Sequence, residues 1–225
     1  MTIQAAEKTA HWSVEHRNNL MIGGIAAIVV VAAVVGGWYY LSTQEQKASF
    51  DLSQAVRTLD IPLRPASQPA QPDFPTFTSA KERNETAKKQ FQAIVDKYPH
   101  TRSGDMARYF VAVTTADLGD TAGAERSYKE VASSGNKELA SVAKLALAGL
   151  YGNTNRVKDA VALYQELINK PTMSVSKTMA QMQLAELYQA SNQPVDAKHL
   201  FEQIKKDNPT GDVGQIATQK LAEVK

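Results

Sequence analysis

The chain of 225 residues contains no cysteine. This absence excludes a disulfide framework, a thiolate metal site, a cysteine nucleophile and the acylated cysteine that anchors lipoproteins. Histidine is scarce. The four histidines are scattered, and no two lie at metal-ligand spacing inside a predicted helix. A phosphate-binding loop and a nucleophile elbow are also missing. We therefore expect no catalytic residue, no metal and no cofactor, and a protein that is not an enzyme.

An excess of charge of either sign is missing as well. The chain has 25 Lys and Arg residues against 23 Asp and Glu residues, for a formal net charge of +2. No predicted face concentrates the basic residues that phosphate groups require. We therefore expect neither a nucleic acid nor a small-molecule substrate, which leaves proteins and membranes as partners.

A long apolar run stands near the start of the chain, at residues 20–41, and no charge occurs between Arg17 and Glu45. A transmembrane helix needs about 20 such residues. A buried core helix is one alternative, but soluble helices rarely stay apolar on every face over this length. A cleaved signal peptide is the other, although its apolar core is shorter and is followed by small residues.

Aromatic residues follow this run in place of small ones: Trp38, Tyr39 and Tyr40. Such residues are typical of the membrane interface. We therefore predict an uncleaved transmembrane signal anchor at residues 20–41. Positive charges flank the anchor almost evenly. Because Arg17 lies close to the membrane edge, we predict that the tail, residues 1–19, lies on the inner side of the membrane and the long domain on the outer side.

The rest of the chain repeats itself. Four aromatic residues recur at intervals of 37, 36 and 37, and each follows an alanine by four positions: Ala87 and Phe91, Ala124 and Tyr128, Ala160 and Tyr164, Ala197 and Phe201. This spacing places both residues of each pair on one face of a helix. A period of this length is typical of a solenoid, in which stacked units bury a continuous core.

A second register marks a partner helix in each unit. Leu-Ala pairs recur at intervals of 37, and in two units a tyrosine follows the leucine by four positions: Leu147, Ala148 and Tyr151, then Leu184, Ala185 and Tyr188. Pro209 closes the last of these units. Small residues let paired helices approach closely, and proline blocks further helix.

At these residues the chain resembles the tetratricopeptide repeat family. The resemblance implies an all-α fold, with the anchor followed by a right-handed α-solenoid of about four repeats at residues 79–209 and a C-terminal capping helix at residues 210–225. Three departures from the family pattern occur. Lys144 and Gln181 replace the family's helix A tryptophan in two repeats, and the closing proline is missing near Asn136. The period also exceeds the family's usual length of about 34 residues.

Between the anchor and the first full repeat we predict a membrane-proximal helix at residues 42–60. Residues 61–78 follow and hold five of the chain's nine prolines. This segment is either a tether or an insertion that splits an atypical first repeat.

The resemblance also implies a peptide-binding groove along the first helix of each repeat. Carrying its positions over gives Met106, Tyr109, Val113, Val142, Leu145, Met179, Met182, Glu186 and Gln189, with Ala116, Gly149 and Gly152 beside them. Methionine adapts to unlike apolar ligands, which favours a promiscuous binder. The alternative is that these residues fill the array's own core or lie under its cap.

In layout the whole chain resembles the ancillary subunit of the bacterial SecYEG translocon. That resemblance implies a single-pass protein of the inner membrane whose array faces the periplasm and engages translocon subunits, chaperones or secretory polypeptides. An adaptor or chaperone-like protein is thus our first hypothesis. A scaffold in another envelope complex, for division or outer-membrane assembly, is the alternative.

Overall fold

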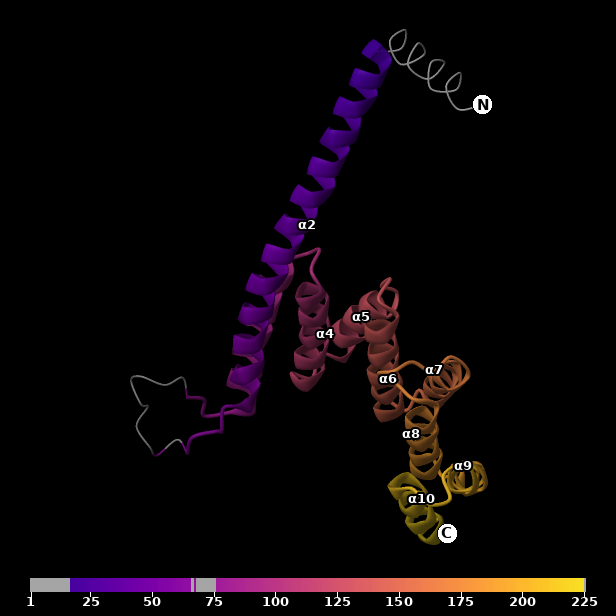
Figure 1. Ribbon diagram of the computed structural model, residues 1–225. Helices are drawn as coiled ribbons and strands as arrows, with labels where there is room; N and C mark the ends of the chain where they lie inside the picture. Colours follow the sequence, from indigo (N-terminus) through magenta and orange to yellow (C-terminus); the bar gives the residue numbers. More distant parts are fainter. Residues whose placement is uncertain (1–16, 66, 68–75, 225) are drawn as a thin grey trace, which may run out of the picture. The chain divides into compact units, whose positions relative to one another are not determined.

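The computed structural model describes residues 17–65, 67 and 76–224. This part of the chain is helical, and its one isolated β-bridge joins Leu63 to Phe77. The helices are α2 (Arg17–Asp60), α3 (Ala80–Lys97), α4 (Arg102–Asp117), α5 (Thr121–Ala132), α6 (Lys137–Asn153), α7 (Val157–Asn169), α8 (Lys177–Ala190), α9 (Pro194–Asp207) and α10 (Asp212–Glu223) (Figure 1). The all-α prediction is confirmed.

The chain divides into two compact units, residues 1–47 and residues 48–225, and the division falls inside α2. In the first unit every side chain from residue 21 to residue 41 is exposed. This helix is long and apolar enough to cross a membrane, a test that a signal sequence also passes. The predicted anchor and the predicted membrane-proximal helix are therefore parts of one continuous helix.

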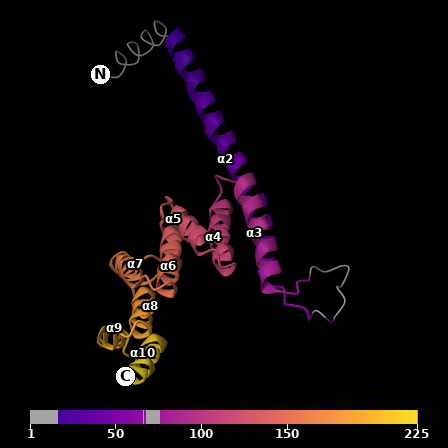
Figure 2. The ribbon, with the colours of Figure 1, turned by 180° about the vertical axis from the view of Figure 1, so that it is seen from behind.

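The second unit is an array in which each helix packs against the next along the chain. Three pairs form its body: α4 with α5, α6 with α7, and α8 with α9. We call the first helix of a pair helix A and the second helix B. Figures 1 and 2 show α6 and α8 following one another, with α7 and α9 beside them on one side. The last helix, α10, packs against α9 and ends the described array.

The turn inside each pair has the same backbone form. One residue in each turn has a positive φ: Gly119 at 83°, Asn155 at 62° and Asn192 at 56°. The next residue's N–H donates to a carbonyl one turn back in the helix, as from Arg156 to Tyr151 at 2.8 Å and from Gln193 to Tyr188 at 2.9 Å. A left-handed residue after a helix is the usual way to satisfy its last carbonyl groups.

Side-chain caps begin five of the helices. In each, a polar side chain accepts a hydrogen bond from the backbone N–H three residues later: Ser79 before α3, Thr101 before α4, Asp120 before α5, Asn136 before α6 and Ser176 before α8. Such caps stabilise a helix by roughly 1 kcal/mol, because they satisfy an N–H that has no partner within the helix.

Two connections between pairs rest on glycine. A Cβ on Gly104 would collide with the carbonyl oxygen of Tyr98, and a Cβ on Gly214 would collide with that of Asn208. Tyr98 and Asn208 each precede a proline. The proline bend therefore brings a backbone carbonyl against the first turn of the next helix, where only glycine fits.

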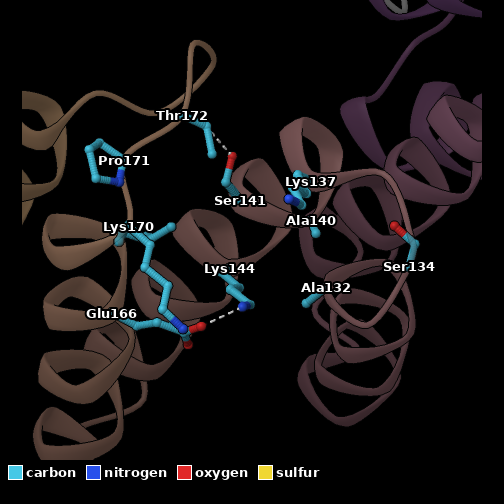
Figure 3. Close-up of a pocket in the computed structure, with 11 residues that line it drawn as sticks. Ala132, Ser134, Lys137, Ala140, Ser141, Lys144, Glu166, Lys170, Pro171 and Thr172 are labelled. Atoms are coloured by element: carbon cyan, nitrogen blue, oxygen red, sulfur yellow. Dashed lines mark hydrogen bonds and ion pairs between the residues drawn. The ribbon is translucent and has the colours of Figure 1, made fainter.

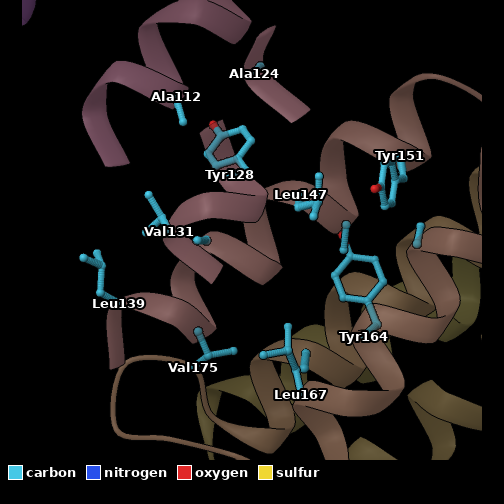
Figure 4. Close-up of a cluster of buried hydrophobic side chains, with 14 of the residues drawn as sticks. Ala112, Ala124, Tyr128, Val131, Leu139, Leu147, Tyr151, Tyr164, Leu167 and Val175 are labelled. Carbon is cyan, nitrogen blue, oxygen red and sulfur yellow. The ribbon is translucent and has the colours of Figure 1, made fainter. Parts of the chain in front are cut away.

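Aromatic and small side chains fill the core. Tyr128 and Tyr164 are buried between helices, and fully buried alanines such as Ala112 and Ala124 let the helices approach closely (Figure 4). The predicted scaffold residues are buried, with two exceptions, since Tyr188 is half-buried and Pro209 is exposed.

The end of α2 from residue 48 onward belongs to the array. Ala48 and Ala55 are buried in one cluster with Ala87 and Phe91 of α3. The phenol of Tyr98 donates to the Asp51 carboxylate at 2.9 Å, which also joins α3 to α2. Residues 61–79 thus connect two helices that pack together as a pair.

Candidate functional site

The predicted groove residues lie on α4, α6 and α8, the three helices A of the array. Met106 and Met179 are exposed, at 38% and 46% of their surface. The others are half-buried: Tyr109, Val113, Val142, Leu145, Met182, Glu186 and Gln189. Each repeat therefore presents partly covered apolar side chains from its first helix.

Packing holds most of these side chains from behind. Tyr109, Val113, Val142 and Leu145 contact the central core. The rings of Tyr109 and Tyr128 lie 6.0 Å apart, and burial raises the pKa of both phenols above its ordinary value. The apolar face is thus fixed in place by the scaffold.

The three methionines differ in their surroundings. Met182 packs into the C-terminal cluster with residues of α8, α9 and α10. This agrees with the alternative that some of the groove residues lie under the C-terminal cap. Met106 and Met179, at the starts of α4 and α8, keep a large exposed surface. A ligand on this face would therefore meet Met106 and Met179 more readily than Met182.

The predicted interface aromatics lie within α2 and are strongly exposed. Their exposed fractions are 70% for Trp38, 69% for Tyr39 and 61% for Tyr40. Consecutive helical residues point about 100° apart, so the three rings spread around the helix. Such a ring of aromatics suits the headgroup level of a bilayer.

A cavity of about 580 Å³ opens where α5, α6 and α7 come together (Figure 3). The end of α5, the first half of α6, the end of α7 and the loop after it form its walls. None of the predicted groove residues is among its lining residues. The sequence analysis did not predict this cavity.

Polar contacts fix two of its walls. Lys144 on α6 lies 2.7 Å from the Glu166 carboxylate on α7, and the hydroxyls of Ser141 and Thr172 lie 2.8 Å apart. The sequence analysis noted Lys144 only as a departure from the repeat pattern. Its spacing of 22 residues from Glu166 recurs between Gln181 and Gln203, which are hydrogen-bonded at 3.2 Å, so this signal was present.

The loop from residue 170 to residue 176 is pinned beside the cavity. The Glu138 carboxylate accepts hydrogen bonds from the N–H groups of Met173 and Ser174, at 3.4 and 2.7 Å, and these bonds lower its pKa. Val175, within the loop, is fully buried. The loop therefore holds Met173 outward with 97% of its surface exposed.

A second polar cluster joins two consecutive repeats. The Glu125 carboxylate accepts from Lys129 at 2.7 Å, from the Tyr151 hydroxyl at 3.0 Å and from Arg156 at 2.7 Å. The Arg156 guanidinium also lies 4.0 Å from the centre of the Tyr151 ring. These partners, with Lys129 foremost, lower the pKa of Glu125 to about 2. The cluster ties α5 to α6 and to the start of α7.

Comparison with known proteins identifies the repeats. The profile of the family described as "Tetratricopeptide repeat-like domain" matches residues 10–166, and the profile described as "Tetratricopeptide repeat" matches residues 179–211. No curated protein sequence matches the chain significantly.

Among solved structures, a crystal structure of a tetratricopeptide repeat protein from Parabacteroides merdae is similar, with a TM-score of 0.53 and 16% sequence identity. The similarity covers 80% of this chain and 60% of that one. At this identity it shows the fold alone, and it agrees with the predicted tetratricopeptide-like solenoid.

Proposed function

Because the chain belongs to the tetratricopeptide repeat-like domain family, we propose that its array is a protein-binding module tethered to the bacterial inner membrane by α2. The array lies in the periplasm and acts as an adaptor or chaperone-like protein at the secretion translocon. The protein-binding role follows from the repeats, since solenoids of this kind use their extended surfaces to bind partners.

The exposed apolar surface of α2 carries the proposal of a tether. Residues 21–41 are apolar around the whole helix, and no side chain among them is buried. An apolar surface of this size is unfavourable in water and is covered by the hydrocarbon of a bilayer. The aromatic residues Trp38, Tyr39 and Tyr40 support the same role, since they follow the run as interface residues do.

The extent of the family match adds support. It begins at residue 10, before the apolar segment, and continues through residue 166. The apolar helix and the first repeats are therefore covered by one family profile, as expected if the helix and the array work together.

The exposed methionines on helix A support binding of varied partners. Met106 and Met179 present flexible, polarizable side chains above a fixed apolar face. Such a surface suits unfolded or dissimilar segments, as an adaptor for secreted chains would need. The layout's resemblance to the ancillary translocon subunit gives the proposed location.

The tether is tested by single-cysteine labelling, because the chain has no cysteine of its own. We expect a membrane-impermeant maleimide to label Thr210→Cys in spheroplasts, and to label Ala10→Cys only after lysis. Labelling of both positions before lysis, or an intact mass that lacks residues 1–41, would contradict a single-pass anchor.

The partners are tested by photocrosslinking in cells from a probe amino acid at Met179. The control probe replaces Lys198, an exposed residue on α9. Translocon subunits, chaperones or many secretory proteins trapped only from Met179 would support the adaptor. One stoichiometric envelope partner would favour a scaffold instead, and equal labelling from both positions would reject this face as the binding surface.

A further inference from the structure

The buried side chain of Tyr164 on α7 lacks the hydrogen bond that other buried tyrosines make. The hydroxyl of Tyr98 donates to the Asp51 carboxylate at 2.9 Å. The hydroxyl of Tyr151 donates to the Glu125 carboxylate at 3.0 Å. Tyr164 has only 4% of its surface exposed, yet its hydroxyl has no hydrogen-bond partner in the part of the chain that the structure describes. Polar groups of buried side chains are almost always paired, so this hydroxyl marks the place of a missing partner.

The Tyr164 hydroxyl reaches the predicted groove at Gly149 of α6. A Cβ on Gly149 would have this hydroxyl as its nearest neighbour, at 4.0 Å. The hydroxyl oxygen is open to solvent, although the rest of the side chain is buried. Three residues later, a Cβ on Gly152 would lie 3.0 Å from the Leu187 side chain, so α8 lies beside α6 here. Two groove positions without side chains therefore leave the phenol oxygen open to a ligand.

A carboxylate without a counter-charge comes close to this hydroxyl from α8. Glu186 is half-buried, and no other residue of the predicted groove is charged. Its carboxylate accepts a hydrogen bond from the Gln183 side chain at 3.0 Å and makes no ion pair with the residues that the structure describes. Burial raises the pKa of the Tyr164 phenol, and the negative charge of Glu186 raises it further, as expected of two groups that lie close together.

The same combination occurs one repeat earlier. Tyr128 on α5 is 5% exposed, and its hydroxyl also lacks a hydrogen-bond partner among the described residues. Asp117, at the end of α4, is exposed and makes no ion pair with them. Burial is the main cause of the raised pKa of Tyr128, and the nearby Tyr109 and the charge of Asp117 add to it. The predicted groove thus lies beside unpaired acceptor oxygens and negative charge, and none of its residues is basic.

Apolar side chains lie one helical turn from Gly149 and Glu186. Leu145 precedes Gly149 by four positions on α6, and so lies on the same face of that helix. Met182 precedes Glu186 by four positions on α8 in the same way. Both side chains are half-buried. A ligand that places a positive charge at Glu186 therefore meets apolar surface next to it.

This inference rests on the proposed protein-binding role of the array. We propose that the predicted groove binds a basic segment of a partner protein. A lysine or arginine of that segment lies over Gly149 and donates to the Tyr164 hydroxyl and the Glu186 carboxylate, while a neighbouring apolar residue covers Leu145 and Met182. An acidic segment would meet like charge at Glu186. A purely apolar segment would remove water from both polar groups without replacing its hydrogen bonds, which costs free energy.

The test uses the full-length chain in nanodiscs of phosphatidylcholine, whose headgroups carry no net charge. Ligands are selected on it from a displayed library of random heptapeptides, and the enriched sequence is made as a synthetic peptide. The test variants are Glu186→Gln and Tyr164→Phe. The matched control is Glu202→Gln, which removes the same charge from an exposed position on α9. Circular dichroism melting checks that every variant folds.

We expect the wild type to enrich lysine or arginine at one position, next to an apolar residue. The peptide should bind Glu186→Gln about tenfold more weakly, because this variant lacks the charged acceptor, and should bind Glu202→Gln as it binds the wild type. Tyr164→Phe should weaken binding about threefold, and its melting should be unchanged because the hydroxyl has no partner in the chain to lose. Gly149→Leu keeps both polar groups but covers them from α6, and should abolish binding.

Several results would overturn the proposal. Enrichment of peptides without a basic residue would do so and would leave the protein-binding module standing. Equal loss of binding in Glu186→Gln and Glu202→Gln would assign the attraction to the charge of the whole array. Full binding after glutamine replaces the basic residue of the peptide would also contradict the proposal. Enrichment of no peptide would overturn it as well, and photocrosslinking from Met179 decides separately whether the array binds proteins.

Discussion

The Lys144 ammonium lies 2.7 Å from the Glu166 carboxylate and joins the two helices of one repeat. In the next repeat the same two positions hold Gln181 and Gln203, joined by a hydrogen bond of 3.2 Å. Both pairs bridge α-helices at a place where the repeat pattern usually has tryptophan. The repeat therefore tolerates a polar bridge there, whether it is charged or neutral.

This equivalence predicts that Lys144→Gln with Glu166→Gln changes the free energy of unfolding by no more than about 0.5 kcal/mol, because partly exposed ion pairs contribute little. Urea denaturation of the full chain in detergent, followed by circular dichroism, measures it. Leu167→Ala, at a buried position beside the pair, shows the sensitivity of the assay, since it should cost about 2 to 5 kcal/mol. A loss above about 2 kcal/mol in the double variant would contradict the equivalence.

The Glu125 cluster predicts acid sensitivity. The pKa of this carboxyl in the folded chain is about 2, below its ordinary value of 4.5, so its stabilising contribution is complete above pH 4.5 and is lost as the pH falls toward 2. Unfolding measured between pH 6 and pH 2 should show a smaller decline in Glu125→Gln than in the wild type.

Glu130→Gln, an exposed change on the same helix, is the control for that experiment. It should leave the acid-induced decline as in the wild type. If Glu125→Gln and the wild type lose stability in parallel, the contacts with Lys129, Tyr151 and Arg156 do not act in solution as they do in the structure.

The turn between α4 and α5 predicts a cost that comes from the backbone alone. Gly119 has a φ of 83°, and an added Cβ would meet no atom within 4 Å. Gly119→Ala should therefore lower the free energy of unfolding by about 1 to 2 kcal/mol, the cost of a left-handed conformation for a residue with a Cβ. Gly135→Ala, which is equally open but has no positive φ, should cost nothing, and equal losses would argue against backbone strain.

Gly104 predicts a larger cost from steric overlap. Alanine there would press its Cβ against the Tyr98 carbonyl oxygen, which the following proline holds in place, so we expect a loss of about 2 kcal/mol or more. Gly149→Ala, whose nearest new neighbour is the Tyr164 hydroxyl at 4.0 Å, should instead stabilise α6 by about 0.5 to 1 kcal/mol. Thermal melting of both variants distinguishes the two effects, and a neutral Gly104→Ala would refute the close packing.

The repeat period made the helical array predictable. Phe91, Tyr128, Tyr164 and Phe201 recur because each must fill the gap between the two helices of its pair, and that geometric demand imposes a period on the sequence. The turns carried a similar signal that the sequence analysis did not use. Gly119, Asn155 and Asn192 recur at intervals of 36 and 37, since few other residues adopt a positive φ easily.

The cavity was not predictable in the same way. Its walls come from the end of α5, the start of α6, the end of α7 and the loop after α7, and the repeat period alone does not show that these segments enclose a cavity. Lys137 and Lys170 read as ordinary surface lysines until the fold places them at one cavity. The groove residues were assigned by register, but the register does not show that Met182 packs into a cluster with residues of α10 and is half-buried there.

The two ends of the proline-rich segment lie close together, and this bears on how its length can change. The Arg64 N–H donates to the Phe77 carbonyl at 2.8 Å, so the chain leaves the first helix pair and returns to it at nearly one point. When the two ends of a connection are held together, each doubling of its length adds only about 0.6 kcal/mol to the entropic cost of closing it. The segment can therefore change in length at little cost in stability. A reporter domain can also be inserted there without interrupting the array.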